Sequence, residues 1–137
     1  MNHINPARTE TLTQLMLGGL PTGRVGSPLY ASLRYFDPAR QRAGIPEDVA
    51  ALVEKLSADE TVVSLVNVSQ LDAKTVVVQG GGYGEHQIQS VTVDGAASQT
   101  IDGNAFTVKL GPGCGATLSI KMTRYANQPQ FAFPWDA

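Results

Sequence analysis

The chain has few of the residues that build metal and redox sites. It contains one cysteine, Cys114, and two histidines, His3 and His86, among 137 residues. One cysteine excludes an internal disulfide and a cysteine-based metal cluster, and two histidines are too few for a histidine-rich metal site. We therefore expect no metal and no cofactor. Cys114 lies in the turn sequence Gly-Pro-Gly-Cys-Gly at 111–115, and we expect a buried or half-buried thiol without a chemical role.

Charged residues are also scarce. They make up 16% of the chain, against about 25% in typical globular domains, while hydrophobic residues reach 42%. This composition is unlike that of a long disordered segment. The formal net charge of −2 argues against a nucleic-acid-binding protein, which carries a basic surplus. No stretch approaches the ~18 consecutive apolar residues of a transmembrane helix. We expect neither a nucleic acid nor a membrane as a partner.

The first part of the chain carries no periodic pattern. Glycines and prolines interrupt every candidate element in residues 1–28. We expect an extended N-terminal segment or a connector from an upstream domain, with a short strand or turn near 12–17. The regular patterns lie in residues 29–137, which we expect to form the domain.

The next segment predicts one strand and one helix. Apolar residues alternate through 29–36 and stop at Asp37-Pro38, which indicates a strand, and 40–44 reads as a solvated loop. Residues 46–57 begin with a proline and acidic residues, which suit the first turn of a helix. Their apolar residues are spaced at i, i+3, i+4 and i+7: Val49, Leu52, Val53 and Leu56. This spacing predicts a short amphipathic helix that packs on the core.

The remainder predicts strands. Apolar alternation or β-branched runs occupy 61–68, 74–79, 86–94, 106–110 and 117–123. Asp94-Gly95 and Asp102-Gly103 are dipeptides favoured in tight hairpin turns. Strands at this spacing, joined by turns, favour an antiparallel arrangement over βαβ units. The predicted fold class is mainly β: an antiparallel β-sandwich with one short packing helix at about 46–57.

The C-terminal segment 124–136 holds four of the nine aromatic residues. Its prolines, Pro129 and Pro134, exclude a central strand. We expect an extended ribbon over the body, with its rings covering apolar surface. The alternative is that the rings bind a ligand, since carbohydrate modules stack sugars on exposed aromatic side chains. The candidate ligand contacts are Tyr83, His86, Tyr125, Phe131, Phe133 and Trp135.

The glycine-rich stretch 80–84 lacks the features of a phosphate loop. No Lys-Ser/Thr pair follows it, and the next element is a predicted strand rather than a helix. We expect a flexible turn. Glu85 and His86 are adjacent on a predicted strand and would point to opposite faces, so we expect solvated side chains rather than an acid–base pair.

No set of residues predicts catalysis. The candidate carboxylates lie at predicted turns or near the chain end, where they bond the local backbone: Asp37, Asp94, Asp102 and Asp136. No nucleophile elbow is present. Arginines in the first third of the chain and the acidic residues of 47–60 favour charge pairing within the protein or between domains.

One resemblance extends over residues 61–122. The strand sequence Val63–Ser69, the run Thr75–Val78 and the closing stretch Gly113–Ile120 resemble the C-terminal antiparallel β-sandwich domain that follows the catalytic barrel in many bacterial glycoside hydrolases. Those domains carry no catalytic residues, so the resemblance implies none here.

Three hypotheses of function follow. The first is a non-catalytic accessory domain of a larger bacterial protein, which packs on an upstream domain of the same polypeptide or on a second copy of the chain. The second is a carbohydrate-binding module that uses the aromatic residues. The third is a small enzyme, which would need a pocket with convergent ionisable groups.

Overall fold

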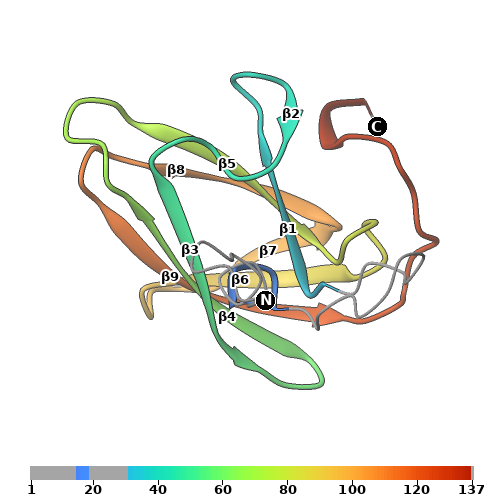
Figure 1. Ribbon diagram of the computed structural model, residues 1–137. Helices are drawn as coiled ribbons and strands as arrows, with labels where there is room; N and C mark the ends of the chain where they lie inside the picture. The colour runs from blue at the N-terminus through green and yellow to red at the C-terminus, as the bar shows by residue number, and fades with distance from the viewer. Residues whose placement is uncertain (1–14, 19–30, 137) are drawn as a thin grey trace, which may run out of the picture.

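Two antiparallel β-sheets form the body of the computed structural model, which describes residues 15–18 and 31–136 (Figure 1). The first sheet has the order β2-β1-β5-β8, with strands Arg42–Ala43, Leu33–Asp37, Lys74–Gly80 and Ala105–Leu110. The second has the order β3-β4-β9-β6-β7, with strands Val49–Leu56, Glu60–Asn67, Gly115–Thr123, Gln87–Val93 and Gln99–Gly103. A short 3-10 helix, η1, spans Pro134–Asp136. The predicted antiparallel β-sandwich is confirmed.

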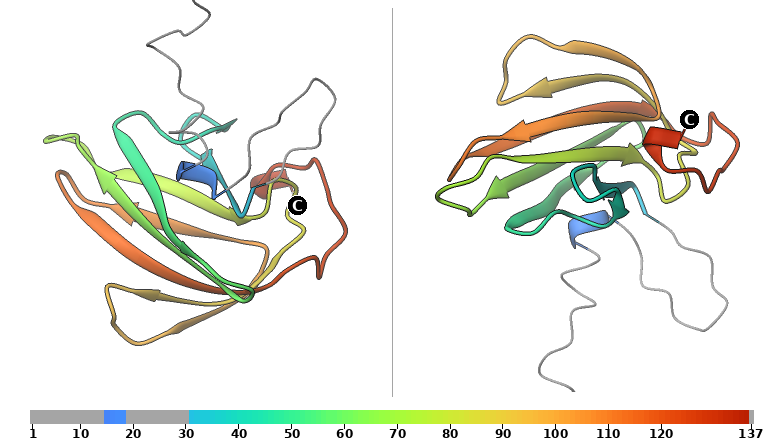
Figure 2. Two further views of the ribbon diagram at one scale, coloured as in Figure 1. Left: turned by 60° about the horizontal axis from the view of Figure 1, so that its bottom comes forward. Right: turned by 90° about the horizontal axis from the view of Figure 1, so that it is seen from above.

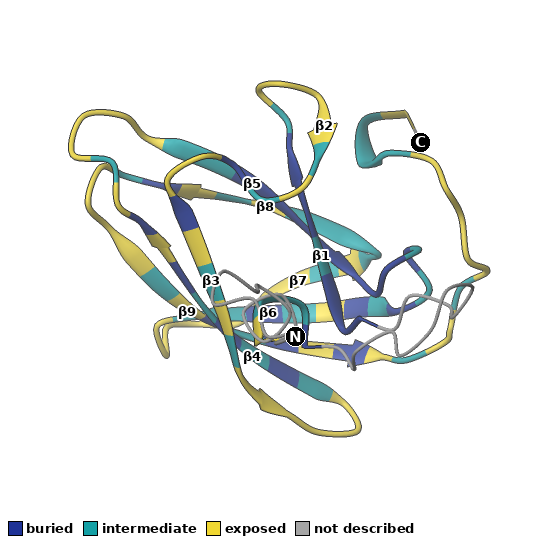
Figure 3. Ribbon diagram, viewed as in Figure 1, coloured by how far each residue is buried: buried dark blue, intermediate teal, exposed yellow. Residues whose placement is uncertain are grey.

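The core lies between the two sheets and follows the predicted alternation. In β9, Leu118, Ile120 and Met122 are buried, whereas Thr117 and Lys121 between and beside them are exposed. The bands of buried and exposed residues alternate along the strands in Figure 3. A period of two places every second side chain between the sheets, and burial of each large aliphatic side chain contributes about 1.5–3 kcal/mol.

The predicted helix at 46–57 is wrong. Residues 49–56 form β3, an edge strand that pairs antiparallel with β4. Asp48 has φ of 66°, a left-handed conformation that cannot continue into an α-helix. The amide of Val49 bonds the carbonyl of Pro46 at 3.2 Å, so the proline begins a turn rather than a helix.

A β-bulge explains how a helical spacing fits a strand. The register of β3 against β4 shifts between Val53 and Lys55. Val49, Ala51 and Val53 face the core at the period of a strand, while Leu52 lies on the outer face and is 42% exposed. The extra residue at the bulge reverses the alternation beyond it. Pairing with β4 therefore outweighs the weak helical preference of the segment.

The turns agree with the prediction in one place and differ in two. Asp94 and Gly95 both have positive φ, and the Ala96 amide bonds the Val93 carbonyl at 2.9 Å, as a hairpin turn between β6 and β7 requires. Asp102 and Gly103 instead end β7, after which the chain crosses to β8 in the other sheet. The loop expected at 40–44 contains the two-residue strand β2, which pairs with β1.

A short helical segment covers part of the core near β1 and β3. This single turn at 15–17 packs Met16 and Leu17 on the core, and Gly18 after it lies next to Ser32 and Val53. The Ser32 amide bonds the Leu17 carbonyl at 2.9 Å, and the Tyr35 hydroxyl bonds the Met16 carbonyl at 2.6 Å. The turn expected near 12–17 is present in the part that is described, and the rest of the expected 1–28 connector lies outside the described residues.

The C-terminal segment 124–136, here called the strap, runs along one end of the sandwich beside the loop at 80–86 (Figure 2). It contains no strand, and it ends in η1. The predicted extended ribbon is present.

Candidate functional site

The strap and the glycine loop, residues 80–86, bond to each other along their backbones. The Asn127 amide donates to the Glu85 carbonyl at 3.1 Å, and the Gln130 amide donates to the Tyr83 carbonyl at 2.8 Å. The Asn127 side chain donates to the Gln87 side-chain oxygen at 2.9 Å. These bonds bring together two segments about forty residues apart in sequence, and with them four of the six predicted contact residues: Tyr83 with Phe131 and His86 with Tyr125.

The glycine loop is packed rather than flexible and solvated. Gly80, Gly81, Gly82 and Gly84 are buried. A β-carbon at Gly81, where φ is +84°, would overlap the Glu85 carboxylate, which accepts a bond from the Tyr83 amide at 2.9 Å. The glycines therefore let Glu85 fold back over the loop.

His86 is buried, at 2% exposure, contrary to the expected solvated side chain. Its Nδ1 accepts the Tyr125 amide proton at 3.0 Å, and its ring meets the Tyr125 ring edge-on with centroids 4.9 Å apart. Burial lowers the pKa of His86; the Glu85 carboxylate opposes this shift, and the Arg124 guanidinium adds to it. No hydrogen bond joins Glu85 to His86 in the described structure, so the two side chains have separate structural roles.

The end of the strap is anchored by a cluster of rings on the outer face of β1. Phe133 and Trp135 meet the Phe36 ring edge-on, with centroids 5.7 and 6.0 Å away. The Arg34 guanidinium lies 4.9 Å from the centre of the same Phe36 ring. Phe36 is consequently 1% exposed, although it lies on the outside of its sheet. Phe133 and Trp135 cover apolar surface, as the ribbon interpretation expects.

Two other rings of the strap remain open to solvent. Phe131 is 87% exposed and Tyr125 is 65% exposed. Phe131 packs edge-on against Tyr83 with centroids 5.5 Å apart. The four rings of the strap thus divide into an anchoring pair, Phe133 and Trp135, and an exposed pair, Tyr125 and Phe131, and the exposed pair presents the most ring surface to a ligand.

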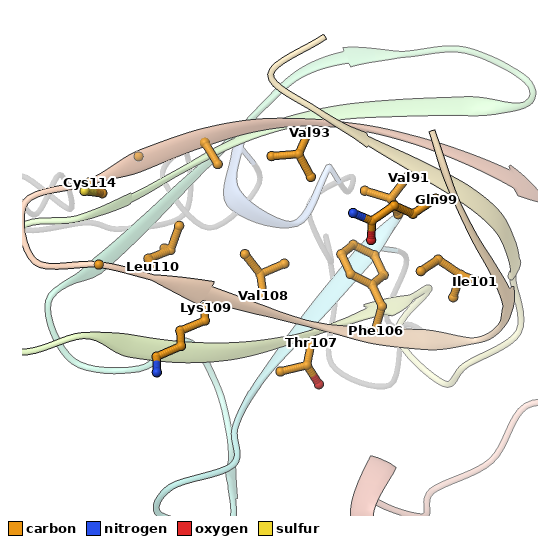
Figure 4. Close-up of a pocket in the computed structure, with 13 residues that line it drawn as sticks. Val91, Val93, Gln99, Ile101, Phe106, Thr107, Val108, Lys109, Leu110 and Cys114 are labelled. Atoms are coloured by element: carbon orange, nitrogen blue, oxygen red, sulfur yellow. The ribbon is translucent and has the colours of Figure 1, made fainter. Parts of the chain in front are cut away.

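An apolar groove of about 320 Å³ lies on the side of the sandwich where β7 crosses to β8 (Figure 4). Val91, Val108 and Phe106 point into it from both sheets, whereas Lys109 points away from it. Its lining also includes Val93, Gln99, Ile101, Thr107, Leu110, Gly111, Cys114, Gly115 and Ala116. No carboxylate or histidine belongs to this lining, so the groove offers apolar contact rather than acid–base chemistry.

Cys114 is exposed at one end of this groove, in contrast to the buried or half-buried thiol that the sequence predicts. Its sulfur lies 3.5 Å from the Pro112 carbonyl oxygen. Its neighbours in sequence, Gly113 and Gly115, have no side chains that could cover the thiol.

Two of the candidate carboxylates bond the backbone, Asp37 locally and Asp94 across to β9. Asp37 is buried, and its Oδ1 accepts the amides of Ala39 and Arg40 at 3.1 and 3.3 Å. Asp94 accepts the Thr117 amide at 2.8 Å. Arg40 pairs with Glu47 at 3.1 Å, which agrees with the predicted charge pairing within the protein. Among residues 15–18 and 31–136, no group of three histidine, cysteine, aspartate or glutamate side chains is placed to hold a metal ion.

A row of exposed aliphatic residues marks the outer face of β3 and β4. Ala50 pairs with Val66 across the two strands. Leu52, Val66 and Val68 are 42%, 42% and 57% exposed. We call Ala50, Leu52, Val66 and Val68 the outer patch. On the neighbouring β9, the same face carries Thr117 and Ser119, so the apolar character is confined to this edge of the sheet.

The sequence interpretation missed the outer patch and the groove. The helical interpretation placed Leu52 on a buried stripe, and the groove depends on how far the two sheets separate. Phe36 carried a detectable signal: as a second aromatic directly after Tyr35, it interrupts the apolar alternation of its strand, which indicates an apolar contact on the outer face.

No helix among the described residues is long and apolar enough to cross a membrane. Comparison of the chain with protein-family models, with curated proteins and with solved structures found no match.

Proposed function

We propose that the chain is a non-catalytic accessory β-sandwich domain of a larger bacterial protein, and that its outer patch packs on an upstream domain of the same polypeptide. The outer patch carries this proposal. A strand face that borders solvent is usually polar, and several aliphatic side chains exposed on such a face favour an interaction surface. Ser64, the cross-strand partner of Leu52, separates Leu52 from Val66 within the outer patch. The resemblance to the C-terminal sandwich of bacterial glycoside hydrolases supports the same role.

The lining of the apolar groove supports a non-catalytic role. The apolar groove is lined without carboxylate or histidine. Ionisable groups meet at a smaller pocket of about 180 Å³ lined by Asp37, Arg40, Glu47 and Lys74, where Asp37 bonds the local backbone and Arg40 pairs with Glu47. His86 and Asp37 are buried and engaged in backbone hydrogen bonds. An enzyme needs convergent acid, base or nucleophilic groups around space for a substrate.

Covalent footprinting of exposed side chains tests the proposal. The chain is compared alone and joined to the polypeptide that precedes it in its reading frame. We expect labelling of Leu52 and Val66 to fall several-fold in the longer polypeptide, while labelling of Phe131, at the other end of the sandwich, stays unchanged. Equal labelling of the outer patch in both forms would contradict the proposal.

The other predicted partner is a second copy of the chain, and a measurement of self-association tests it. A double variant, Leu52→Gln with Val66→Thr, keeps strand-compatible residues at both positions and removes much of the apolar surface. If the isolated chain forms a stable dimer that this variant dissociates, the outer patch is a homo-oligomer interface and the upstream-domain proposal is wrong. A monomer in analytical ultracentrifugation agrees with the upstream-domain proposal.

A carbohydrate-binding module is the second candidate, and the exposed Phe131 and Tyr125 rings favour it. Exposed aromatic faces stack on apolar ligand surfaces. A glycan array with the unaltered chain and with Phe131→Ala tests this candidate. Binding that the substitution abolishes supports it. Retention on no glycan excludes it for the glycans tested.

A further inference from the structure

One buried histidine holds the start of the strap against the glycine loop. The Tyr125 amide donates to His86 Nδ1 at 3.0 Å. A ring that accepts at Nδ1 is neutral and carries its proton on Nε2. Tyr125 has φ of +58°, a conformation that is uncommon for a bulky residue and persists only where surrounding contacts hold it. The bond to His86 is one of these contacts.

Beyond this bond, the middle of the strap is held by few and mostly exposed contacts. The Asn127 and Gln130 amides bond the loop, the Asn127 side chain bonds Gln87 and the Phe131 ring meets Tyr83, but residues 128–132 are exposed. Segments that are held by partly exposed hydrogen bonds and little apolar burial open locally at low free-energy cost. The Phe36–Phe133–Trp135 cluster provides a separate apolar anchor further along.

We propose that His86 is a proton-operated latch: a proton on its Nδ1 releases residues 125–131 of the strap from the glycine loop, while the ring cluster keeps the strap's end attached. Protonation turns the acceptor into a donor, so two N–H groups face each other across the former bond. Release also lets Tyr125 leave its left-handed conformation. This inference is independent of the accessory role proposed above.

Burial and the charges around His86 determine the pH range in which the strap opens. Burial disfavours the imidazolium cation, and so does the Arg124 guanidinium at the start of the strap, while the Glu85 carboxylate in the loop favours the cation. The pKa of His86 is therefore lower with the strap closed than in the solvated ring, whose ordinary value is 6.5. As the pH falls below that value, the ratio of open to closed strap rises up to tenfold for each pH unit. The rise ends at the pKa of the closed form.

Amide hydrogen exchange measured by NMR tests the latch. The readouts are the amides of Asn127 and Gln130, at about pH 7.5 and about pH 5, which bracket the usual histidine range. After correction for the intrinsic pH dependence of exchange, we expect several-fold less protection of both amides at the lower pH. The far-UV circular dichroism should stay unchanged, which shows that the sandwich remains folded. Unchanged protection, or a simultaneous loss of the sandwich signal, would overturn the proposal.

Two variants show which of the two histidines causes the pH response. His86→Gln keeps a side-chain acceptor that does not titrate, and we expect it to lose the pH response of both amides. His3→Gln removes the second histidine of the chain, and we expect it to keep the response. If His86→Gln fails to fold, the unaltered chain still tests the proposal. The NMR titration of the His86 imidazole and the loss of amide protection must then occur over the same pH range. Titration of His86 without that change contradicts the latch.

Discussion

Replacement of Asn67 by alanine should destabilise the sandwich more than any surface substitution of the same kind. Asn67 is 1% exposed, and the two hydrogens of its amide nitrogen are shared among the carbonyls of Asp72, Leu110 and Gly111, at 2.8, 3.3 and 3.2 Å. Its oxygen accepts the Ser69 amide at 3.0 Å. The side chain thus ties the end of β4 to the following loop and to the end of β8, across the two sheets.

The expected cost follows from the groups left without partners. A buried polar group that loses its partner costs about 1–3 kcal/mol, and a partly buried group costs less because water reaches it. The Leu110 carbonyl bond is buried, whereas the bonds to Asp72 and Gly111 are partly buried. We expect Asn67→Ala to lower the free energy of unfolding by about 2–4 kcal/mol.

Urea denaturation, with the slope m unchanged, measures this loss. Asn127→Ala is the matched control, because Asn127 also donates two side-chain bonds but lies in the strap. We expect it to cost less than about 1 kcal/mol. If Asn67→Ala costs no more than Asn127→Ala, Asn67 does not join the two sheets energetically, and the reasoning is refuted.

Three further predictions concern single positions. Gly115→Ala should cost about 1–3 kcal/mol because its β-carbon would lie 2.7 Å from a β4 side chain, whereas Gly103→Ala, whose β-carbon would make only ordinary contacts at 3.9 Å, should be near neutral in the same urea assay. Asp48→Gly should leave the free energy of unfolding unchanged or raise it by up to about 1 kcal/mol, since φ is +66°; a loss of that size would favour a helix there. Burial raises the pKa of Tyr35 above its ordinary 10.0, so the fold favours the neutral phenol and stability should fall as the pH rises past about 10. Tyr35→Phe should cost about 1 kcal/mol at neutral pH, for the lost bond to Met16, and should weaken the alkaline loss seen in pH-dependent melting.

The sequence predicted the strands whose burial is decided by local alternation. β9 shows this most clearly, because its inward residues are all apolar and its outward residues are polar or glycine. β3 could not be predicted in the same way. Its Val-Ala-Ala-Leu-Val-Glu-Lys-Leu sequence fits a helical stripe and a bulged strand equally well, and only the partner strand decides between them.

The candidate site was predictable in its residues but not in its geometry. Aromatic side chains in a proline-containing segment indicated that the strap lies on the body. The burial of His86 depends on a segment 39 positions further along the chain. The covering of Phe36 likewise depends on the C-terminal residues Phe133 and Trp135. Contacts at such distances leave no periodic trace in the sequence.

The position of β9 has a consequence for how the protein is made. The last strand of the chain lies at the centre of the five-stranded sheet, between β4 and β6. A nascent chain emerging from the ribosome can form the β3–β4 and β6–β7 hairpins early, but they stay separate until residues 115–123 follow. Until then, each hairpin exposes an unpaired hydrophobic edge, which is open to intermolecular pairing. Folding should therefore be slow and concerted, and chains that end before Gly115 should aggregate instead of accumulating as a stable fragment.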